Sequence, residues 1–178
     1  MLVEHDRLLR TYQERVADWD VDGGVRDRWH ALCRVVLTHG GDLVVPPMTP
    51  EPDLDLLLTS GAPQGPVLDA PEPGGDCHDN VARLWIDGAI PAVGTGYALS
   101  EGLWRQHSWG VHADGTVQET KWPCERYFGV TLPPGEPTVR FVLNSYDGDV
   151  LAMLKAGGPG AAEIIRVMRN RRTAPPAA

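Results

Sequence analysis

The sequence predicts an α+β fold in which helices come first and a run of antiparallel strands follows. Before residue 41, apolar side chains recur three and four positions apart, which is the spacing of amphipathic helices. From residue 92 to residue 144, short apolar runs alternate with turn signals, which is typical of strands. Helices and strands that are segregated along a chain indicate α+β architecture. The length of 178 residues fits one domain with a sizeable core.

Two amphipathic helices are predicted in the N-terminal part. The first covers residues near 4–20 and is closed by Gly23-Gly24, and the second ends before Gly40-Gly41. Cys33 falls within the second apolar stripe, so we interpret it as a core residue. The apolar positions of the two stripes are Leu8, Leu9, Tyr12, Val16 and Trp19, and Val25, Trp29, Leu32, Cys33 and Val36.

A proline-rich segment separates these helices from the rest of the chain. Residues 42–75 contain eight prolines, which interrupt helices and central strands. We expect an extended, loop-rich course with a short helical turn at Asp53–Leu58. A segment of this length without regular structure is typical of wall or lid material around a functional site.

A third helix is predicted to follow Asp76, with Cys77 as its first or second residue. Gly74-Gly75 indicates a loop, and Asp76 is a typical N-cap residue. A thiol in the first turn lies beside free backbone N–H groups and the positive end of the helix dipole, which lower its pKa. The same N–H groups can stabilise an oxyanion. Alternatively, Cys77 shares helical spacing with Val81 and Trp85 and simply extends an apolar core stripe.

Five strands and a closing helix are predicted after this helix. The second and third strands flank Ala113-Asp114-Gly115, which is a hairpin signature. Residues 173–178 are expected to form a disordered tail. The strands are Ala92–Leu99, Leu103–His112, Thr116–Trp122, Arg126–Thr131 and Thr138–Asn144, and the helix is Ala161–Asn170.

Composition and charge argue against several classes of protein. No apolar run reaches the length of a membrane span, and the N-terminus lacks the pattern of a signal peptide. We therefore expect a cytoplasmic protein without a membrane partner. The three cysteines are widely spaced, unlike a disulfide framework or a paired-cysteine zinc site. The net charge of −8 argues against nucleic acid, because the only basic cluster is Arg166, Arg169, Arg171 and Arg172.

His107 and Glu119 complete a candidate catalytic group with Cys77. A thiol nucleophile needs a base that removes its proton and later protonates the leaving amine. That base needs an acceptor that holds its tautomer. Cys77, His107 and Glu119 supply these three roles in that order. The side chains predicted to bind the substrate are Trp109, Gln106 and Asp76.

The length of the hairpin turn decides whether His107 and Glu119 share a face. A two-residue turn at Asp114-Gly115 would make Glu119 point away from His107. A three-residue turn with Gly115 in the left-handed conformation pairs His112 with Thr116 instead. Glu119 then becomes a diagonal neighbour of His107, at about 7–8 Å between backbones, which their side chains can span. The glycine at the third position favours this turn.

Other interpretations of these residues stay open. His107 can be a hydrogen-bonded sheet histidine and Glu119 a solvated charge. His112 has the opposite parity and is interpreted as a surface residue. A metal site that adds His78 to the catalytic group is disfavoured, because an adjacent Cys-His without a second close pair is poor zinc spacing. We expect neither a metal nor a cofactor, and Cys124 has no evident activating partner in the sequence.

These motifs resemble the papain-like thiol superfamily, and its transglutaminase-like and arylamine N-acetyltransferase-like branches are the most similar. The resemblance rests on Gly75-Asp76-Cys77 at a helix start, His107-Ser108-Trp109-Gly110 in a hairpin strand and an acidic residue in the next strand. It covers roughly residues 74–145. It implies a nucleophile at Cys77, a base at His107 and an orienting carboxylate at Glu119, on a helix packed against an antiparallel sheet.

Two features depart from the pattern of that superfamily. Those branches usually carry Asp where this chain has Glu119, so Asn144 and Asp147 are further candidates for the third member. No glutamine directly precedes Cys77, so no side chain is assigned as oxyanion donor beside the Cys77 backbone. The candidates for that donor are Gln64 and Gln106.

We therefore expect a cysteine-dependent acyl-transfer enzyme that hydrolyses an amide or peptide bond through an acyl-thioester on Cys77. Transfer to an amine acceptor, as in acyltransferases and transglutaminases, shares the first half-reaction and is the alternative. A non-catalytic binding module with the same fold is the alternative from another class. The expected substrate is a small molecule, a peptide or an acyl-thioester, and the oligomeric state is open. The expected single catalytic domain covers residues 1–172, with a helical part (1–41), the proline-rich part (42–75) and a core (76–172).

Overall fold

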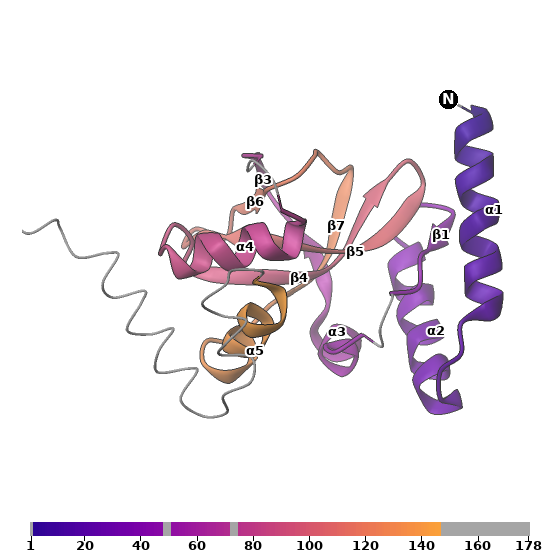
Figure 1. Ribbon diagram of the computed structural model, residues 1–178, viewed down its shortest axis with the longest axis horizontal. Helices are drawn as coiled ribbons and strands as arrows, with labels where there is room; N and C mark the ends of the chain where they lie inside the picture. The colour runs from indigo at the N-terminus through magenta and orange to yellow at the C-terminus, as the bar shows by residue number, and fades with distance from the viewer. Residues whose placement is uncertain (1, 48–50, 72–74, 147–178) are drawn as a thin grey trace, which may run out of the picture. The chain divides into compact units, whose positions relative to one another are not determined.

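The computed structural model describes residues 2–47, 51–71 and 75–146 (Figure 1). Within these ranges the chain forms five helices and seven strands, which confirms the predicted α+β class. The helices are α1 (Leu2–Asp18), α2 (Gly23–Leu37), α3 (Leu54–Ser60), α4 (Cys77–Ile86) and α5 (Glu136–Ser145). The strands are β1 (Leu43–Val44), β2 (Ala62–Gln64), β3 (Val67–Asp69), β4 (Ala92–Ser100), β5 (Leu103–Val111), β6 (Val117–Glu119) and β7 (Arg126–Thr131). The predicted helix Ala161–Asn170, the tail 173–178 and Asp147 lie outside the described residues.

The strands form one mixed sheet with the order β2-β7-β4-β5-β6-β3, and β1 pairs with β5. Strand β5 is antiparallel to β6, and β2 is antiparallel to β7. In contrast, β1 runs parallel to β5, and β3 runs parallel to β6. The expectation of a purely antiparallel sheet is therefore wrong. The parallel strands β1 and β3 come from the proline-rich segment, whose pairing partners are distant in sequence.

The chain divides into two compact units, each assembled from separate segments. The first unit comprises Met1–Gln64, Gly96–His107 and Cys124–Val130. The second comprises Gly65–Thr95, Ser108–Pro123 and the chain from Thr131 onward. Each unit has buried apolar side chains of its own.

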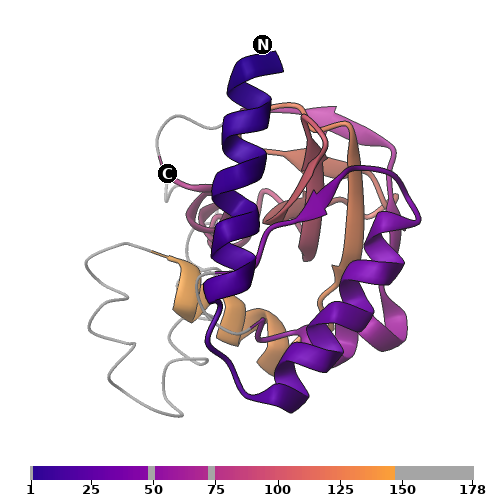
Figure 2. The same ribbon diagram turned by 90° about the vertical axis from the view of Figure 1, so that its right-hand side faces the viewer.

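In the first unit, α2 supplies much of the buried apolar surface. Asp22 caps this helix by accepting hydrogen bonds from the backbone N–H of Gly24 (2.9 Å) and that of Val25 (3.4 Å). Helix α3 packs against α2 (Figure 2). It matches the helical turn predicted at Asp53–Leu58, shifted by one or two residues. The most buried apolar side chains of the unit include Trp29, Leu32, Leu57, Tyr97, Leu103 and Trp104.

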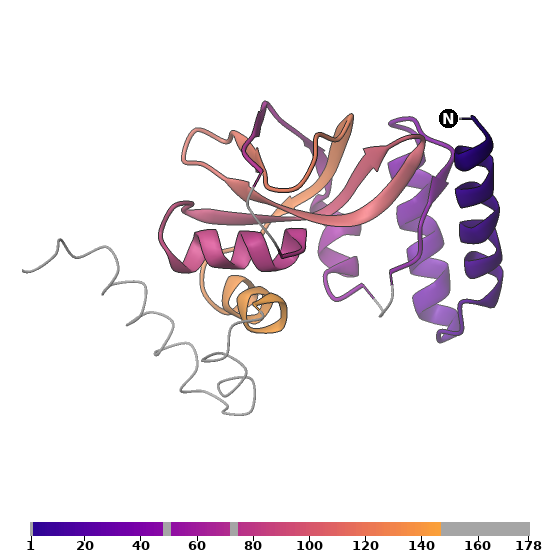
Figure 3. The same ribbon diagram turned by 45° about the horizontal axis from the view of Figure 1, so that its top comes forward.

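In the second unit, α4 and α5 pack together (Figure 3). The guanidinium of Arg83 lies 5.9 Å from the ring centroid of Tyr146, just after α5. Trp109 of β5 packs directly over Gly94 of β4, where a Cβ would come within 1.9 Å of the indole Nε1. Buried apolar side chains of α4 and the residues after it are Val81, Ala82, Trp85, Ile86 and Ile90.

Residues 138–144 form most of helix α5, so the strand predicted at Thr138–Asn144 is wrong. The β-branched side chains in this stretch suggest a strand by propensity alone. However, Pro137 lies in the first turn, where its ring favours helix initiation. Thr138 and Val142, four residues apart, are the buried pair of the helix. Packing of this face overrides the local preference.

Candidate functional site

The turn between β5 and β6 has the three-residue geometry predicted from the sequence. The N–H of His112 donates to the carbonyl of Thr116 (2.9 Å), and Gly115 has φ +85°. Beyond the turn, Val111 pairs with Val117 and Gly110 pairs with Gln118. The prediction of a three-residue loop is therefore confirmed.

This register places Glu119 on the same face of the hairpin as His107. When the register of β5 and β6 is continued by one residue pair, Trp109 lies opposite Glu119, and His107 is the diagonal neighbour of Glu119. Both side chains are buried, with 4% of His107 and 1% of Glu119 exposed. The interpretation of Glu119 as a solvated surface charge is therefore wrong, because its carboxylate is enclosed.

Backbone hydrogen bonds hold the carboxylate of Glu119 in place. Its Oε1 accepts from the N–H of Thr120 (2.8 Å) and from that of Lys121 (2.7 Å). Two donors on one oxygen fix the orientation of the group. On the His107 side, the imidazole lies 6.2 Å from the ring centroid of Tyr127. A buried, oriented carboxylate near a buried imidazole is the arrangement that a general base requires.

Cys124 joins this pair, which the sequence did not predict. A nitrogen of His107, a carboxylate oxygen of Glu119 and the sulfur of Cys124 all lie within 4.8 Å of one another. The structure thus places a histidine and a carboxylate near Cys124, for which the sequence offered no evident partner. Imidazole, carboxylate and thiolate are also the ligand types of Zn²⁺, so these three residues could hold a metal. The position of Cys124 could not be predicted from the sequence, because this residue follows Pro123 in an irregular stretch.

Cys77 is the first residue of α4, as predicted. Asp76 has extended backbone geometry, and its Oδ1 accepts from the N–H of Asp79 at 2.8 Å. This is the bond of an N-cap residue. Cys77 is half-buried, whereas Val81, four residues further on, is fully buried. The thiol therefore stands at the helix start and outside the fully buried stripe.

Three polar contacts tie the start of α4 to the hairpin. Nδ1 of His78 lies 2.6 Å from the hydroxyl oxygen of Ser108. The amide of Asn80 donates to the carbonyl of Thr120 at 3.3 Å, and Lys121 donates to the carbonyl of Gly75. Sequence reasoning missed these contacts, because each joins residues at least thirty positions apart. They fix the helix turn that carries Cys77 against β5 and β6.

The predicted substrate-binding side chains lie in different environments. Asp76 is exposed at the helix cap, and Trp109 is fully buried over Gly94. The amide of Gln106 donates to Oε2 of Glu51 at 2.8 Å. Gln64, the other candidate oxyanion donor, donates to the carbonyls of Ala62 and Gly129 (both 3.0 Å). Both candidate amide donors therefore have partners within the protein.

Glu51 is a buried carboxyl that sequence reasoning missed. Because it follows a proline-rich run, the sequence predicts an exposed loop residue, yet only 6% of Glu51 is exposed. Burial raises the pKa of its carboxyl, and hydrogen bonds from the Asp53 backbone, Tyr97 and Gln106 oppose that shift. The group lies beside Gln106, the chain neighbour of His107.

The structure does not support Asn144 or Asp147 as the residue that orients His107 in place of Glu119. Asn144 is an exposed residue of α5, and Asp147 lies outside the described residues. His112 is half-buried, and its Nε2 lies 2.9 Å from Oε1 of Gln118, so it is partnered and not a plain surface residue. Glu119 is the acidic group that the structure brings beside His107.

No protein-family model, no curated protein and no solved structure matches this chain. Among the helices in the described ranges, none combines the length and apolarity needed to cross a membrane.

Proposed function

We propose that this protein is a cysteine-dependent acyl-transfer enzyme that cleaves an amide or peptide bond through an acyl-thioester on Cys77. The observation that carries the proposal is the proximity of His107 and Glu119, because a nitrogen of His107 and a carboxylate oxygen of Glu119 lie within 4.8 Å of each other. A buried carboxylate with a fixed oxygen can hold one tautomer of the imidazole and stabilise its protonated form. The helix start at Cys77 adds backbone N–H groups beside the thiol.

Three side chains carry out the proposed reaction. The Cys77 sulfur attacks the carbonyl carbon while His107 accepts the thiol proton, and Glu119 orients His107. The oxyanion accepts hydrogen bonds from backbone N–H groups of the first turn of α4. Collapse of the tetrahedral intermediate breaks the C–N bond, and His107 protonates the leaving amine. Water, activated by His107, then hydrolyses the thioester and regenerates the thiol.

There are two alternatives to a hydrolase. One differs in the second half of the reaction, and the other carries out no reaction. An amine in place of water would make the protein an acyltransferase of the transglutaminase type. A binding module with the same fold would form no acyl-enzyme. Within the proposed class, Cys124 is the competing thiol, because it lies beside His107 and Glu119.

Intact-mass spectrometry after mixing with p-nitrophenyl acetate tests the proposal. We expect one rapid acetylation in the wild-type protein, lost in Cys77→Ser and retained in the matched controls Cys33→Ser and Cys124→Ser. His107→Ala should slow it by about 10²-fold or more, which is the usual contribution of a general base.

Acetylation that is lost only in Cys124→Ser would show that Cys124 is the nucleophile. No rapid acetylation would favour the binding module. An added primary amine that is recovered as its acetamide with the wild-type protein, and not with Cys77→Ser, would favour amine transfer.

A further inference from the structure

His107, Glu119 and Cys124 place three different kinds of ligand atom close together. A ring nitrogen, a carboxylate oxygen and a sulfur all lie within 4.8 Å of one another. Only 4% of His107 and 1% of Glu119 are exposed, and Cys124 is half-buried. The proposed acyl transfer uses His107 and Glu119 and gives Cys124 no role. The group therefore contains one donor more than that reaction needs.

Contacts outside this group hold its members in place. Two backbone N–H groups donate to Oε1 of Glu119. The backbone N–H of Cys124 donates to the hydroxyl of Tyr127 at 3.3 Å, and the ring of Tyr127 lies 6.2 Å from that of His107. Supporting contacts of this kind orient the ligands of metal sites. The three donors are thus positioned before any ion binds.

We propose that His107, Glu119 and Cys124 bind a divalent transition-metal ion and that Zn²⁺ is the ion they fit best. Imidazole, carboxylate and thiolate are all ligands of Zn²⁺ in proteins. Mg²⁺ and Ca²⁺ take oxygen ligands instead, so a thiolate and an imidazole select against them. Cys124 binds as the thiolate and releases its proton to water. This site is distinct from the one that the sequence disfavours, which would use Cys77 and His78.

The spacing of the three donor atoms suits a tetrahedral ion. Bonds of about 2.0–2.3 Å around Zn²⁺ set neighbouring ligand atoms about 3.3–3.8 Å apart. The observed distances are at most 4.8 Å. Each atom therefore needs to move by about 1 Å or less to reach the ion, which small side-chain rotations supply. Three protein ligands leave the fourth tetrahedral position to water.

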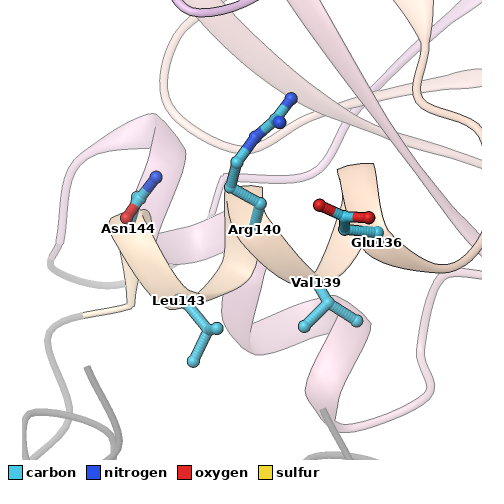
Figure 4. A pocket seen from close by; sticks show the side chains of 5 residues that line it. All are labelled: Glu136, Val139, Arg140, Leu143 and Asn144. Atoms are coloured by element: carbon cyan, nitrogen blue, oxygen red, sulfur yellow. The ribbon is translucent and has the colours of Figure 1, made fainter. Parts of the chain in front are cut away.

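The pocket on the surface of α5 offers no comparable set of donors. Its lining side chains are Glu136, Val139, Arg140, Leu143 and Asn144 (Figure 4). They supply one carboxylate and one amide, but neither an imidazole nor a thiol. The guanidinium of Arg140 is positive, and a positive charge nearby opposes the binding of a cation. The group at Cys124 is therefore the better site for a metal.

A bound metal and the proposed acyl transfer compete for His107. A neutral imidazole has one nitrogen that carries a proton and one that accepts a hydrogen bond. The metal occupies the accepting nitrogen, so His107 can no longer take the proton of Cys77. Zn²⁺ should therefore inhibit the enzyme reversibly. This consequence rests on the proposed function, whereas the binding of the metal does not.

Absorption spectroscopy of the metal-free full chain with added Co²⁺, as a substitute for Zn²⁺, tests the binding. We expect a thiolate-to-cobalt charge-transfer band in the wild-type protein and in the matched control Cys33→Ser. Cys124→Ser should lose this band. Glu119→Gln should weaken cobalt binding by about 10²-fold or more, because loss of a supporting residue alone costs about 10–100-fold. A wild-type protein without the band would overturn the proposal, as would a band that Cys77→Ser removes and Cys124→Ser retains.

Alkylation of the wild-type protein tests the same site without a substitution, which keeps the test valid if Cys124→Ser does not fold. Saturating Zn²⁺ should slow the reaction of Cys124 with iodoacetamide by roughly tenfold or more, because the metal occupies the reactive thiolate. EDTA should restore the rate, and Cys33 should react equally with and without the metal. Equal labelling of Cys124 in both conditions, seen by peptide mapping, would contradict metal binding.

Acetylation by p-nitrophenyl acetate separates this inference from the proposed function. Zn²⁺ should slow the acetylation of the wild-type protein by about tenfold or more, because it removes the general base. An equal inhibition factor in Cys124→Ser would overturn the role of Cys124. A cobalt band in a protein that shows no acetylation would support the metal site and contradict the proposed function. Acetylation in a protein without a cobalt band would overturn the metal site alone.

Discussion

The hydroxyl of Tyr97 donates a hydrogen bond of 3.2 Å to Oε2 of Glu51, and both side chains are buried. Gln106 donates to the same oxygen at 2.8 Å, and the indole N–H of Trp29 donates to the Tyr97 oxygen at 3.4 Å. All hydrogen bonds of this network therefore donate toward the carboxylate of Glu51, which is its final acceptor. It links α2, β4 and β5 with the chain just before α3.

Glu51→Ala should lower the free energy of unfolding by about 2–3 kcal/mol, because it leaves buried donors on Tyr97 and Gln106 without an acceptor. Tyr97→Phe should cost about 1 kcal/mol, since it removes one donor together with its bond. Urea denaturation of both variants and of the double variant measures the coupling between them. Effects that add within about 0.5 kcal/mol would show that the two side chains do not interact.

The stability contribution of Glu51 should fall as the pH rises. Burial raises the pKa of its carboxyl, so the folded state holds this proton more tightly than the unfolded state does. The contribution is therefore fully present below about pH 4, near the unfolded pKa, and is lost as the pH rises through the raised pKa. We expect the free energy of unfolding of the wild type, relative to Glu51→Gln, to decrease across this range. An increase would contradict the raised pKa.

Gly94→Ala should destabilise the protein by about 1–3 kcal/mol through overpacking. The added Cβ would lie 1.9 Å from the indole Nε1 of Trp109, a rigid and fully buried ring. Gly23→Ala is the matched control, because no atom lies within 4 Å of its added Cβ. It should be neutral or slightly stabilising. Equal effects of the two substitutions in thermal unfolding would show that Trp109 does not fill the space above Gly94.

Iodoacetamide at about pH 6 should label Cys77 before Cys33 and Cys124, because the helix start favours its thiolate. Desolvation raises the pKa of Cys33 to about 12, so this thiol should react slowly even at about pH 9. His107→Ala should slow the labelling of Cys77, and peptide mapping identifies the site. Should Cys124 react first and depend on His107, the activated thiol is Cys124.

Cys77→Ala should change the free energy of unfolding by less than about 0.5 kcal/mol, because the thiol is half-buried at the end of a helix. Cys33→Ala should cost about 1 kcal/mol, because this thiol, although also half-buried, is strongly desolvated within the apolar stripe of α2. Chemical denaturation checks both. A larger loss for Cys77→Ala than for Cys33→Ala would support the interpretation of Cys77 as a packing residue.

The sequence by itself determined the features that depend on neighbouring residues. Asp76 caps α4 through the N–H of Asp79, three residues away, so the start of the helix at Cys77 was predictable. Gly115 supplies the positive φ that a three-residue hairpin loop requires, so the register of β5 and β6 followed from the turn. Strand β7 was predicted with the bounds that the structure has.

Only the tertiary structure decided the features that depend on distant partners. Strands β2 and β3 exist because β7 and β6 pair with them, although Pro63 lies within β2 and Pro66 directly precedes β3. Residues 136–145 became a helix because one face is buried, against the local preference for a strand. Cys124 reaches His107 and Glu119 from an irregular stretch, and Glu51 finds donors far along the chain. Local propensities amount to a few tenths of a kcal/mol per residue, so burial and long-range pairing outweigh them.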